Sequence, residues 1–190
     1  MKLIIGVTGA SGVIHAVRLL ETLVSYPEVE THVIMSGWAV KNLDAETDVT
    51  ESYVSTLAKK TYRNEDLAAS PSSGSFKTDG MIIIPCSMKT LAAISCGLCN
   101  NLITRSAEVC IKEGRKLVIC PRETPLDAIQ LENMLKLARI GVRIVPPMPA
   151  YYSHPQTIDD LIDHHIMKVL DQFSIDTGKV RRWNGNENTA

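Results

Sequence analysis

The stretch KLIIGVTGASG, residues 2–12, decides the fold, because an apolar run passes directly into a turn that contains three glycines. The run over 2–8 predicts a buried β-strand, and the residues after the turn predict an amphipathic helix over 11–25. A glycine-rich turn at a helix N-terminus can hold a phosphate group through backbone N–H groups. The stretch therefore predicts a strand–turn–helix unit that binds a phosphate compound.

The same alternation of apolar runs and amphipathic segments continues along the chain. Further strands are expected at 30–35, 80–85, 116–120 and 142–145, and further helices at 50–60, 88–96, 101–113, 127–139 and 157–173. Residues 63–79 are rich in Ser, Pro, Gly and charge and are expected to form a long loop, and the polar tail from Gly178 is expected to fray. Short apolar strands alternating with helices predict one α/β domain over 1–190, with a parallel sheet covered on both faces.

The bulk composition excludes several classes of protein. Hydrophobic residues make up 45% and charged residues 22% of the 190 residues, which is ordinary for a globular protein. The formal net charge of −1 provides no field to attract nucleic acid or a membrane, and the apolar runs are too short to span a bilayer. The odd number of cysteines, five, predicts free thiols in a cytoplasmic protein. Cys96 and Cys99 form a C-x-x-C pair, but without further ligands we expect small buried side chains rather than a metal or redox site.

All five expected strands end in hydroxyl, charged or phenol side chains. Because ligands of open α/β sheets bind beyond the carboxyl ends of the strands, these ends predict one shared site. They are the TGASG turn, Ser36, the segment CSMKT (86–90), the segment PRET (121–124), and Tyr151 with Tyr152. Arg122 lies beside Glu123 at such an end, where the pair could bind a phosphate and move a proton.

The kind of phosphate ligand is narrowed by motifs that the sequence lacks. The glycines depart from the dinucleotide fingerprint, and the second strand ends in Ser36 instead of the acidic residue that holds a ribose. The sequence contains neither a Walker loop nor a Tyr-x-x-x-Lys pair. A mononucleotide such as FMN fits, and a turn needed only for tight packing is the alternative. The loop SPSSGS (70–75) is either a second anion-binding segment or a surface loop.

Two other motifs are interpreted as structural. The segment DDLID (159–163) matches a magnesium diphosphate motif, but it falls in the first turn of a helix that Thr157 is expected to cap. Acidic residues there complement the helix dipole and a capping box. His164 and His165 follow without a carboxylate at ligand spacing, which favours helix surface and core edge over a metal site.

Taken together, the motifs resemble the flavin prenyltransferase family of the UbiX/Pad type over residues 2–183. They are GVTGASG, ETDV (46–49), SSGS, PCSMKTLA (85–92), NNLITRSAEV (100–109), KEGRKLV (112–118), PRETPL (121–126), LENMLKL (131–137) and PPMPAYY (146–152). The segment SSGSFKTDGMIIIPCSMKTLA and the RRWNG tail are most similar to B subunits of hydroxyarylic acid decarboxylase systems. The resemblance implies a flavodoxin-like three-layer α/β/α sandwich that assembles into a dodecamer with sites at subunit contacts.

The resemblance also implies an activity and a set of site residues. Reduced FMN would react with dimethylallyl phosphate, first at flavin N5 and then at C6, without a metal, and prenylated FMN would pass to a UbiD-type decarboxylase. FMN would be held by Gly9, Ala10, Ser11, Ser36, Ser87, Met88, Lys89, Thr90 and Arg122. The prenyl phosphate would be surrounded by Ser73, Arg105, Lys112, Glu123, Tyr152 and Lys168. Catalytic roles would fall to Ser11, Glu123 and Glu46.

Two residues, Lys168 and Leu67, depart from the family pattern. Lys168 stands where some members have Arg, and Leu67 lies near the position where some have Trp. Lys lacks the bidentate fork of Arg, and a missing ring removes a cation–π partner, so both bear on rate and donor preference. Two other functions remain open besides prenyl transfer. One is an FMN-dependent decarboxylase or oxidoreductase of the same fold, and the other is a non-catalytic FMN-carrying subunit of a decarboxylase complex.

Overall fold

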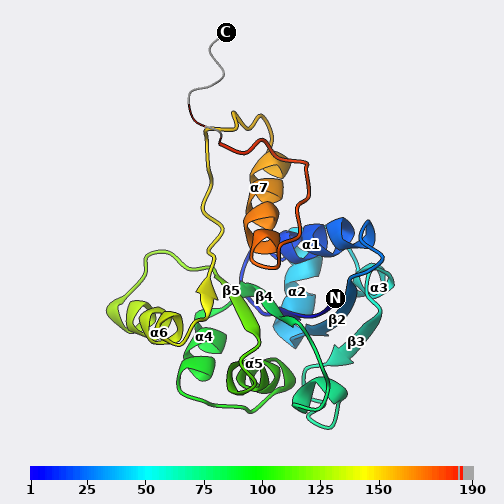
Figure 1. Ribbon diagram of the computed structural model, residues 1–190, viewed down its shortest axis with the longest axis vertical. Helices are drawn as coiled ribbons and strands as arrows, with labels where there is room; N and C mark the ends of the chain where they lie inside the picture. Colours follow the sequence, from blue (N-terminus) through cyan, green and yellow to red (C-terminus); the bar gives the residue numbers. More distant parts are fainter. Residues whose placement is uncertain (184, 186–190) are drawn as a thin grey trace.

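The computed structural model describes residues 1–183 and 185, and it contains a six-stranded parallel sheet between two helical layers (Figure 1). The strands are β1 (Lys2–Val7), β2 (Glu30–Met35), β3 (Lys60–Arg63), β4 (Gly80–Cys86), β5 (Lys116–Pro121) and β6 (Arg143–Ile144). Their order across the sheet is β3-β2-β1-β4-β5-β6. The chain therefore moves outward from β1 in one direction and from β4 in the other. This topology places the switch point, where ligands bind in such sheets, between β1 and β4.

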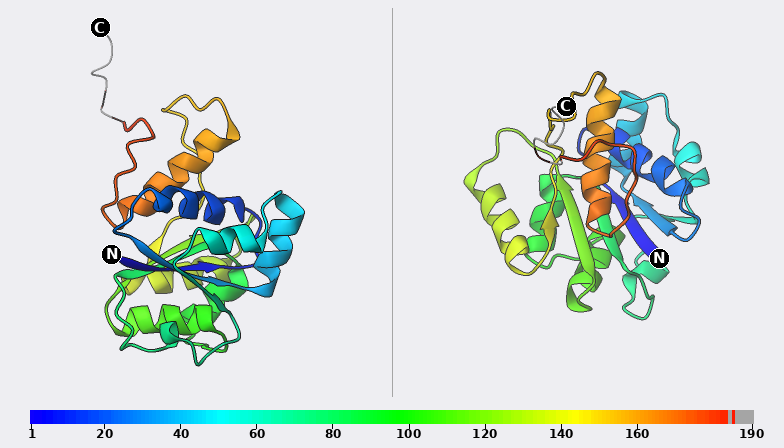
Figure 2. Two further views of the ribbon diagram at one scale, coloured as in Figure 1. Left: turned by 90° about the vertical axis from the view of Figure 1, so that its right-hand side faces the viewer. Right: turned by 45° about the horizontal axis from the view of Figure 1, so that its top comes forward.

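Helices cover both faces of the sheet, as the edge-on view shows (Figure 2, left). One layer contains α1 (Ile14–Val24), α2 (Gly37–Glu46), α3 (Glu51–Thr56) and α7 (Ile158–Asp171). The other contains α4 (Met88–Ser95), α5 (Leu102–Lys112) and α6 (Ala128–Arg139). The predicted flavodoxin-like three-layer sandwich is thereby confirmed.

The continuous apolar runs become strands because both faces of the sheet are buried. In β1, Leu3 and Ile5 point into the layer of α1 and α7, while Ile4 points into the layer of α4 and α5. All three are almost fully buried, and each such aliphatic side chain contributes about 1.5–3 kcal/mol when it leaves water. Two apolar cores, one on each face, hold the strand ends of the sheet in fixed positions.

Three elements were not predicted from the sequence: the strand β3, the short turn η1 and the helix α2. The strand β3 begins within the expected helix 50–60 and reaches the expected loop 63–79, and that loop also contains a short 3₁₀ turn, η1 (Ser70–Ser72). Since β3 is an edge strand, its sequence KTYR is polar and mostly exposed and has no apolar run. The helix α2 was missed because it buries only Ala39 and Leu43 and leaves Trp38 exposed.

The segment DDLID lies in the first turn of α7, as predicted, and forms a capping box. The Thr157 hydroxyl accepts a hydrogen bond from the Asp160 N–H at 3.2 Å, and the Asp160 carboxylate accepts one from the Thr157 N–H at 2.8 Å. Arg18 of α1 pairs with Asp159 at 2.8 Å and with Asp163 at 3.3 Å. These acidic side chains therefore cap α7 and join it to α1.

The described part of the polar tail returns along α7 (Figure 1). Arg182 pairs with Asp171 at 2.7 Å and with Asp176 at 3.0 Å. The ring of Trp183 packs edge-on against Tyr152, with 6.0 Å between the ring centroids. Residues 184 and 186–190, which belong to the tail expected to fray, lie outside the described residues.

Candidate functional site

Hydrogen bonds join the carboxyl ends of three strands beside the switch point. The Thr8 hydroxyl after β1 donates to the Pro85 carbonyl at 2.9 Å and accepts from the Ser87 N–H at 2.8 Å. The Arg122 N–H after β5 donates to the Cys86 carbonyl at 3.1 Å. The sequence prediction that the strand ends converge is confirmed for these segments.

Two helix N-termini open at the same edge, and each is capped by a serine that the sequence had singled out. The Ser36 hydroxyl accepts from the Ala39 N–H at 3.1 Å at the start of α2. The Ser87 hydroxyl accepts from the Thr90 N–H at 3.4 Å and donates to the Thr90 hydroxyl at 3.1 Å at the start of α4. The first N–H groups of a helix have no acceptor within it, so they remain suited to an anion.

The glycine turn between β1 and α1 is held from α2. A methyl group on Gly9 would lie 2.3 Å from Cβ of Trp38, so only glycine permits this approach. The Glu46 carboxylate accepts from the Gly12 N–H at 2.7 Å and from the Val13 N–H at 3.3 Å. Glu46 thus caps α1, which has no cap of its own. A direct catalytic role for Glu46 stays a prediction.

A pocket lies at this edge of the sheet and brings predicted site residues together with unpredicted ones. Ser11 comes from the turn after β1 and Arg122 from the end of β5. The full lining is Ser11, Gly12, His15, Ile84, Pro85, Cys120, Arg122, Pro147 and His165. Glu123 follows Arg122 at the surface, where its carboxylate accepts from the Thr124 N–H at 2.9 Å. Ser11, Arg122 and Glu123, although far apart in the sequence, therefore lie in one region of the folded structure.

Two histidines of this pocket were not predicted as site residues. His165 is buried, not at the helix surface, and its neighbour His164 is buried as well. Burial lowers the pKa of His165 and lowers the pKa of His15 to about 4. Because His15 and His165 come from α1 and α7, no local spacing in the sequence links them.

The cysteines have different environments, although all five are free thiols. Cys86, Cys110 and Cys120 are buried, and burial raises the pKa of each thiol, to about 12 for Cys110. The expectation of burial is wrong for Cys96, which is exposed because it ends α4 at the surface, and Cys99 is half-buried. Among residues 1–183 and 185, no group of three or more His, Cys, Asp or Glu side chains could hold a metal ion.

Lys168 lies on α7, and Tyr152 lies in the loop before this helix. The Tyr152 hydroxyl and Nε2 of His164 are 2.9 Å apart, and Lys168 pairs with Asp171 at 3.6 Å. Burial, followed by the nearby Lys168 ammonium, lowers the pKa of His164. Lys168 and Tyr152 are therefore neighbours of the same histidine.

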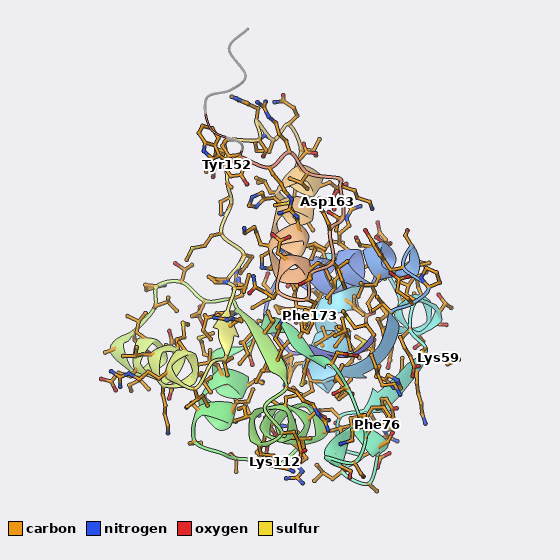
Figure 3. All side chains as sticks on the ribbon, viewed as in Figure 1. Lys59, Phe76, Lys112, Tyr152, Asp163 and Phe173 are labelled. Atoms are coloured by element: carbon orange, nitrogen blue, oxygen red, sulfur yellow. The ribbon has the colours of Figure 1, made fainter. Side chains whose placement is uncertain are left out.

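The remaining predicted phosphate ligands form a separate group on α5. Arg105 donates from Nε to the Ser72 carbonyl at 2.9 Å, which fixes the Ser-rich loop that contains Ser73. Lys112 pairs with Glu113 at 2.5 Å. Figure 3 shows Lys112 and Tyr152 at opposite ends of the molecule. One copy of the protein therefore does not bring its predicted phosphate ligands together.

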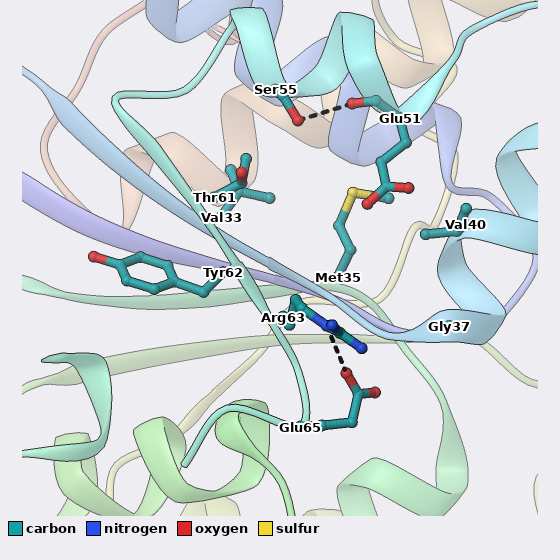
Figure 4. Close-up of a pocket in the computed structure, with 10 residues that line it drawn as sticks. All are labelled: Val33, Met35, Gly37, Val40, Glu51, Ser55, Thr61, Tyr62, Arg63 and Glu65. Carbon is teal, nitrogen blue, oxygen red and sulfur yellow. Dashed lines mark hydrogen bonds and ion pairs between the residues drawn. The ribbon is translucent and has the colours of Figure 1, made fainter. Parts of the chain in front are cut away.

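A second pocket lies over the edge strand β3 and the starts of α2 and α3 (Figure 4). It is lined by Val33, Met35, Gly37, Val40, Glu51, Ser55, Thr61, Tyr62, Arg63 and Glu65. Two of its polar groups are already engaged, because Ser55 donates to the Glu51 carbonyl at 3.0 Å and Arg63 pairs with Glu65 at 4.0 Å. None of the predicted site residues lines this second pocket.

In the described part of the chain, no helix combines the length and apolarity needed to cross a bilayer.

Comparisons with known proteins agree with this geometry. The family described as Flavoprotein matches residues 1–170. The flavin prenyltransferase LpdB of Lactiplantibacillus plantarum is 55% identical over 185 residues, which cover 97% of this chain and 99% of that protein.

Two solved structures are similar over nearly their whole length. A dodecameric FMN-dependent UbiX-like decarboxylase from Escherichia coli O157:H7 is 54% identical with a TM-score of 0.96, covering 97% of this chain and 100% of that one. AnUbiX (PadA1), solved with FMN and dimethylallyl pyrophosphate, is 48% identical with a TM-score of 0.94, covering 97% of both chains.

Proposed function

This chain belongs to the flavoprotein family and, within it, to the UbiX-like flavin prenyltransferases, and from that premise we propose that its pocket joins a dimethylallyl group to reduced FMN. The product is prenylated FMN, with new bonds at flavin N5 and C6. The observation that carries this function is the meeting of Ser11 and Arg122 in one pocket at the switch point, in a chain similar to prenyltransferases over its length.

The residues at the sheet edge fit FMN. The open N–H groups at the starts of α2 and α4, with Ser36, Ser87 and Thr90, suit its phosphate. In our proposal the Gly9–Ser11 turn and the first two residues of α4, Met88 and Lys89, also hold the flavin, and Arg122 of the pocket adds a cation. When bound, reduced FMN supplies an electron-rich ring that acts as the nucleophile. The protein orients this ring and excludes water from it.

The cations of the chain stabilise the phosphate that leaves the prenyl donor. Departure of the phosphate places negative charge on its oxygens, and fixed cations stabilise that charge without a metal. Arg105 and Lys112 on α5, and Lys168 beside Tyr152, supply these cations in our proposal. Lys168 and Tyr152 flank His164, so both can bind the same donor phosphate.

We further propose that the donor phosphate binds where copies of the chain meet. Lys112 and Tyr152 lie at opposite ends of the folded molecule, so a site containing both requires a second copy. A similar solved protein is dodecameric, which supports an assembly of this size. The product would pass to a UbiD-type decarboxylase in the cytoplasm.

Mixing two inactive variants is expected to restore activity if the site is shared. In a shared site, one copy supplies Lys112 from α5 and a second copy supplies Glu123 beside the pocket. Lys112→Ala removes the first group and Glu123→Gln changes the second, so an assembly of either variant alone lacks one group at every site. After dissociation and joint reassembly, random pairing gives intact sites at about a quarter of the positions. The measurement is the prenylation rate of the mixture.

The control is to mix the two variants after each has assembled separately, which should give no recovery. Equal rates before and after joint reassembly, with light scattering showing mixed assemblies, would mean that each chain builds its site alone.

The mass of the flavin product tests the activity itself. We expect reduced FMN and dimethylallyl monophosphate, incubated with the protein, to give a flavin heavier by one dimethylallyl group that replaces a hydrogen. Carbon dioxide release from a carboxylated substrate with an unchanged flavin would favour the decarboxylase alternative. Tight FMN binding with no change in either reagent would favour the carrier alternative.

A further inference from the structure

His15 of α1 and His165 of α7 form a hydrogen-bonded pair in the wall of the pocket. Their Nδ1 atoms are 3.0 Å apart, and their rings meet edge to face with 4.8 Å between centroids. The second ring nitrogen of His165, Nε2, lies 3.0 Å from the Val145 carbonyl. Both histidines line the pocket that Ser11 and Arg122 also line.

The contact with Val145 determines which nitrogen carries each proton. A carbonyl oxygen only accepts, so Nε2 of His165 must be protonated. Neutral His165 then has an unprotonated Nδ1, which accepts the hydrogen bond that Nδ1–H of His15 donates. Neutral His15 is left with an unprotonated Nε2. The chain of donors therefore runs in one direction, from the pocket edge of His15 to the Val145 carbonyl.

The unprotonated edge of His15 faces the glycine turn. A methyl group built on Gly12 would lie 3.4 Å from Cδ2 of His15, the ring atom bonded to Nε2. No described residue forms a hydrogen bond with this Nε2, although His165 and Val145 engage the other ring nitrogens of the pair. The lone pair of His15 is therefore available to a group seated beside Ser11 and Gly12.

We propose that His15 is a catalytic proton acceptor of the prenyl-transfer site and that His165 is its positioning residue. The inference rests on the proposed function. Joining a dimethylallyl group to the reduced flavin forms a bond from flavin to carbon, breaks the carbon–oxygen bond to phosphate and releases one proton from the flavin. Nε2 of His15 takes up that proton. A base oriented by a second side chain, which is itself fixed by a third group, is a recurring arrangement in enzymes.

The hydrogen bonds of the pair stay in place when His15 takes up a proton. Once Nε2 is protonated, Nδ1–H still donates to His165, whose Nε2–H still donates to the Val145 carbonyl. The leaving phosphate adds an anion to the site at the same time, which favours the charged ring. Other titratable groups around His15 are Arg18 on its own helix, Asp159 and Asp163 paired with Arg18, Glu46 at the Gly12 N–H, and Arg122 and Cys120 in the pocket wall.

Neutron diffraction from deuterated crystals of the protein alone tests the arrangement without turnover. We expect deuterium on Nδ1 of His15 and on Nε2 of His165, and none on Nε2 of His15. Deuterium on Nε2 of His15 at neutral pH would overturn the proposal, because that nitrogen could no longer accept a proton.

Two substitutions of His15 separate proton transfer from packing. His15→Asn keeps an amide near Nδ1 that can bond to His165, and His15→Gln keeps one near Nε2, but neither amide takes up a proton. We expect both variants to bind FMN normally and to lower kcat by about 100-fold, within the usual range for a lost acid or base. KM for the prenyl donor should change little. The matched control is His32→Gln, because His32 is a buried histidine that is hydrogen-bonded through both ring nitrogens and lies outside the pocket.

The positioning role of His165 has its own readout. His15 accepts a proton only while it is neutral, so kcat/KM falls as the pH drops through the pKa of His15 in the free protein, which is about 4. Burial is the main cause and His165 the second, so His165→Gln should move this acid limb to higher pH. It should also lower kcat by about tenfold. An acid limb at the same pH, or wild-type kcat in His15→Asn while wild-type protein yields the prenylated flavin, would overturn the inference and leave the proposed function intact.

Discussion

Glu123→Gln is expected to lower kcat for prenylated FMN formation by about 100-fold or more while FMN remains bound. Glu123 is exposed beside the pocket, and among residues 1–183 and 185 its carboxylate accepts a hydrogen bond only from the neighbouring Thr124 N–H, at 2.9 Å. The glutamine carbonyl can accept the same hydrogen bond, so the loop should keep its shape. What the substitution removes is a group that can gain and lose a proton next to Arg122. Flavin titration and single-turnover kinetics separate binding from chemistry.

The matched control is Glu28→Gln, since Glu28 is an exposed carboxylate in the loop before β2, at the opposite edge of the sheet. Its kinetics should equal those of the unchanged protein. Loss of flavin binding in Glu123→Gln, with an intact fold, would make Glu123 a residue that holds the flavin.

Gly80→Ala is expected to destabilise the fold by about 3 kcal/mol or more, because it overpacks a rigid part of the sheet. A methyl group on Gly80 would lie 2.4 Å from the Lys116 carbonyl oxygen and 2.8 Å from Cε1 of Phe173. Gly80 pairs with Lys116 in the parallel ladder of β4 and β5, so the carbonyl cannot move without breaking the register. The measurement is the free energy of unfolding from denaturant titration.

Gly37→Ala is the control for this substitution, because a methyl group at the start of α2 would contact nothing within 4 Å. Alanine favours helix over glycine by about 1 kcal/mol, so this variant should keep or gain stability. An unfolding midpoint of Gly80→Ala equal to that of Gly37→Ala would contradict the steric argument.

The sequence predicted the four strands that are buried on both faces and the edge strand β6, and it missed the polar edge strand β3. In β1, β2, β4 and β5, burial on both faces demands apolar residues, so the pattern is visible without any alignment. The edge strand β3 has one neighbour and can be polar, and its identity depends on pairing with β2. The helix α2 likewise depends on its Ser36 cap and on tertiary contacts of Ala39 and Leu43 more than on periodicity.

Site residues at strand ends were predictable because parallel strands deliver their carboxyl ends to one edge. Ser11 and Arg122 came from this rule, and the pocket contains both. The rule says nothing about His15 and His165, which are 150 residues apart and meet through the packing of α1 against α7. The phosphate-binding roles of Arg105, Lys112 and Lys168 came from the resemblance, and the separation of these residues within one chain depends on the path of α5 relative to α7.

The separation of Lys112 and Tyr152 at the two ends of the folded molecule has a thermodynamic consequence. A ligand that binds only where copies meet strengthens their association by the same factor by which association strengthens its own binding. The prenyl donor would then hold the assembly together as well as react in it, and dilution would lower donor affinity while every chain stayed folded. Only assembled copies would then be active, so the specific activity would rise with protein concentration until all copies are assembled.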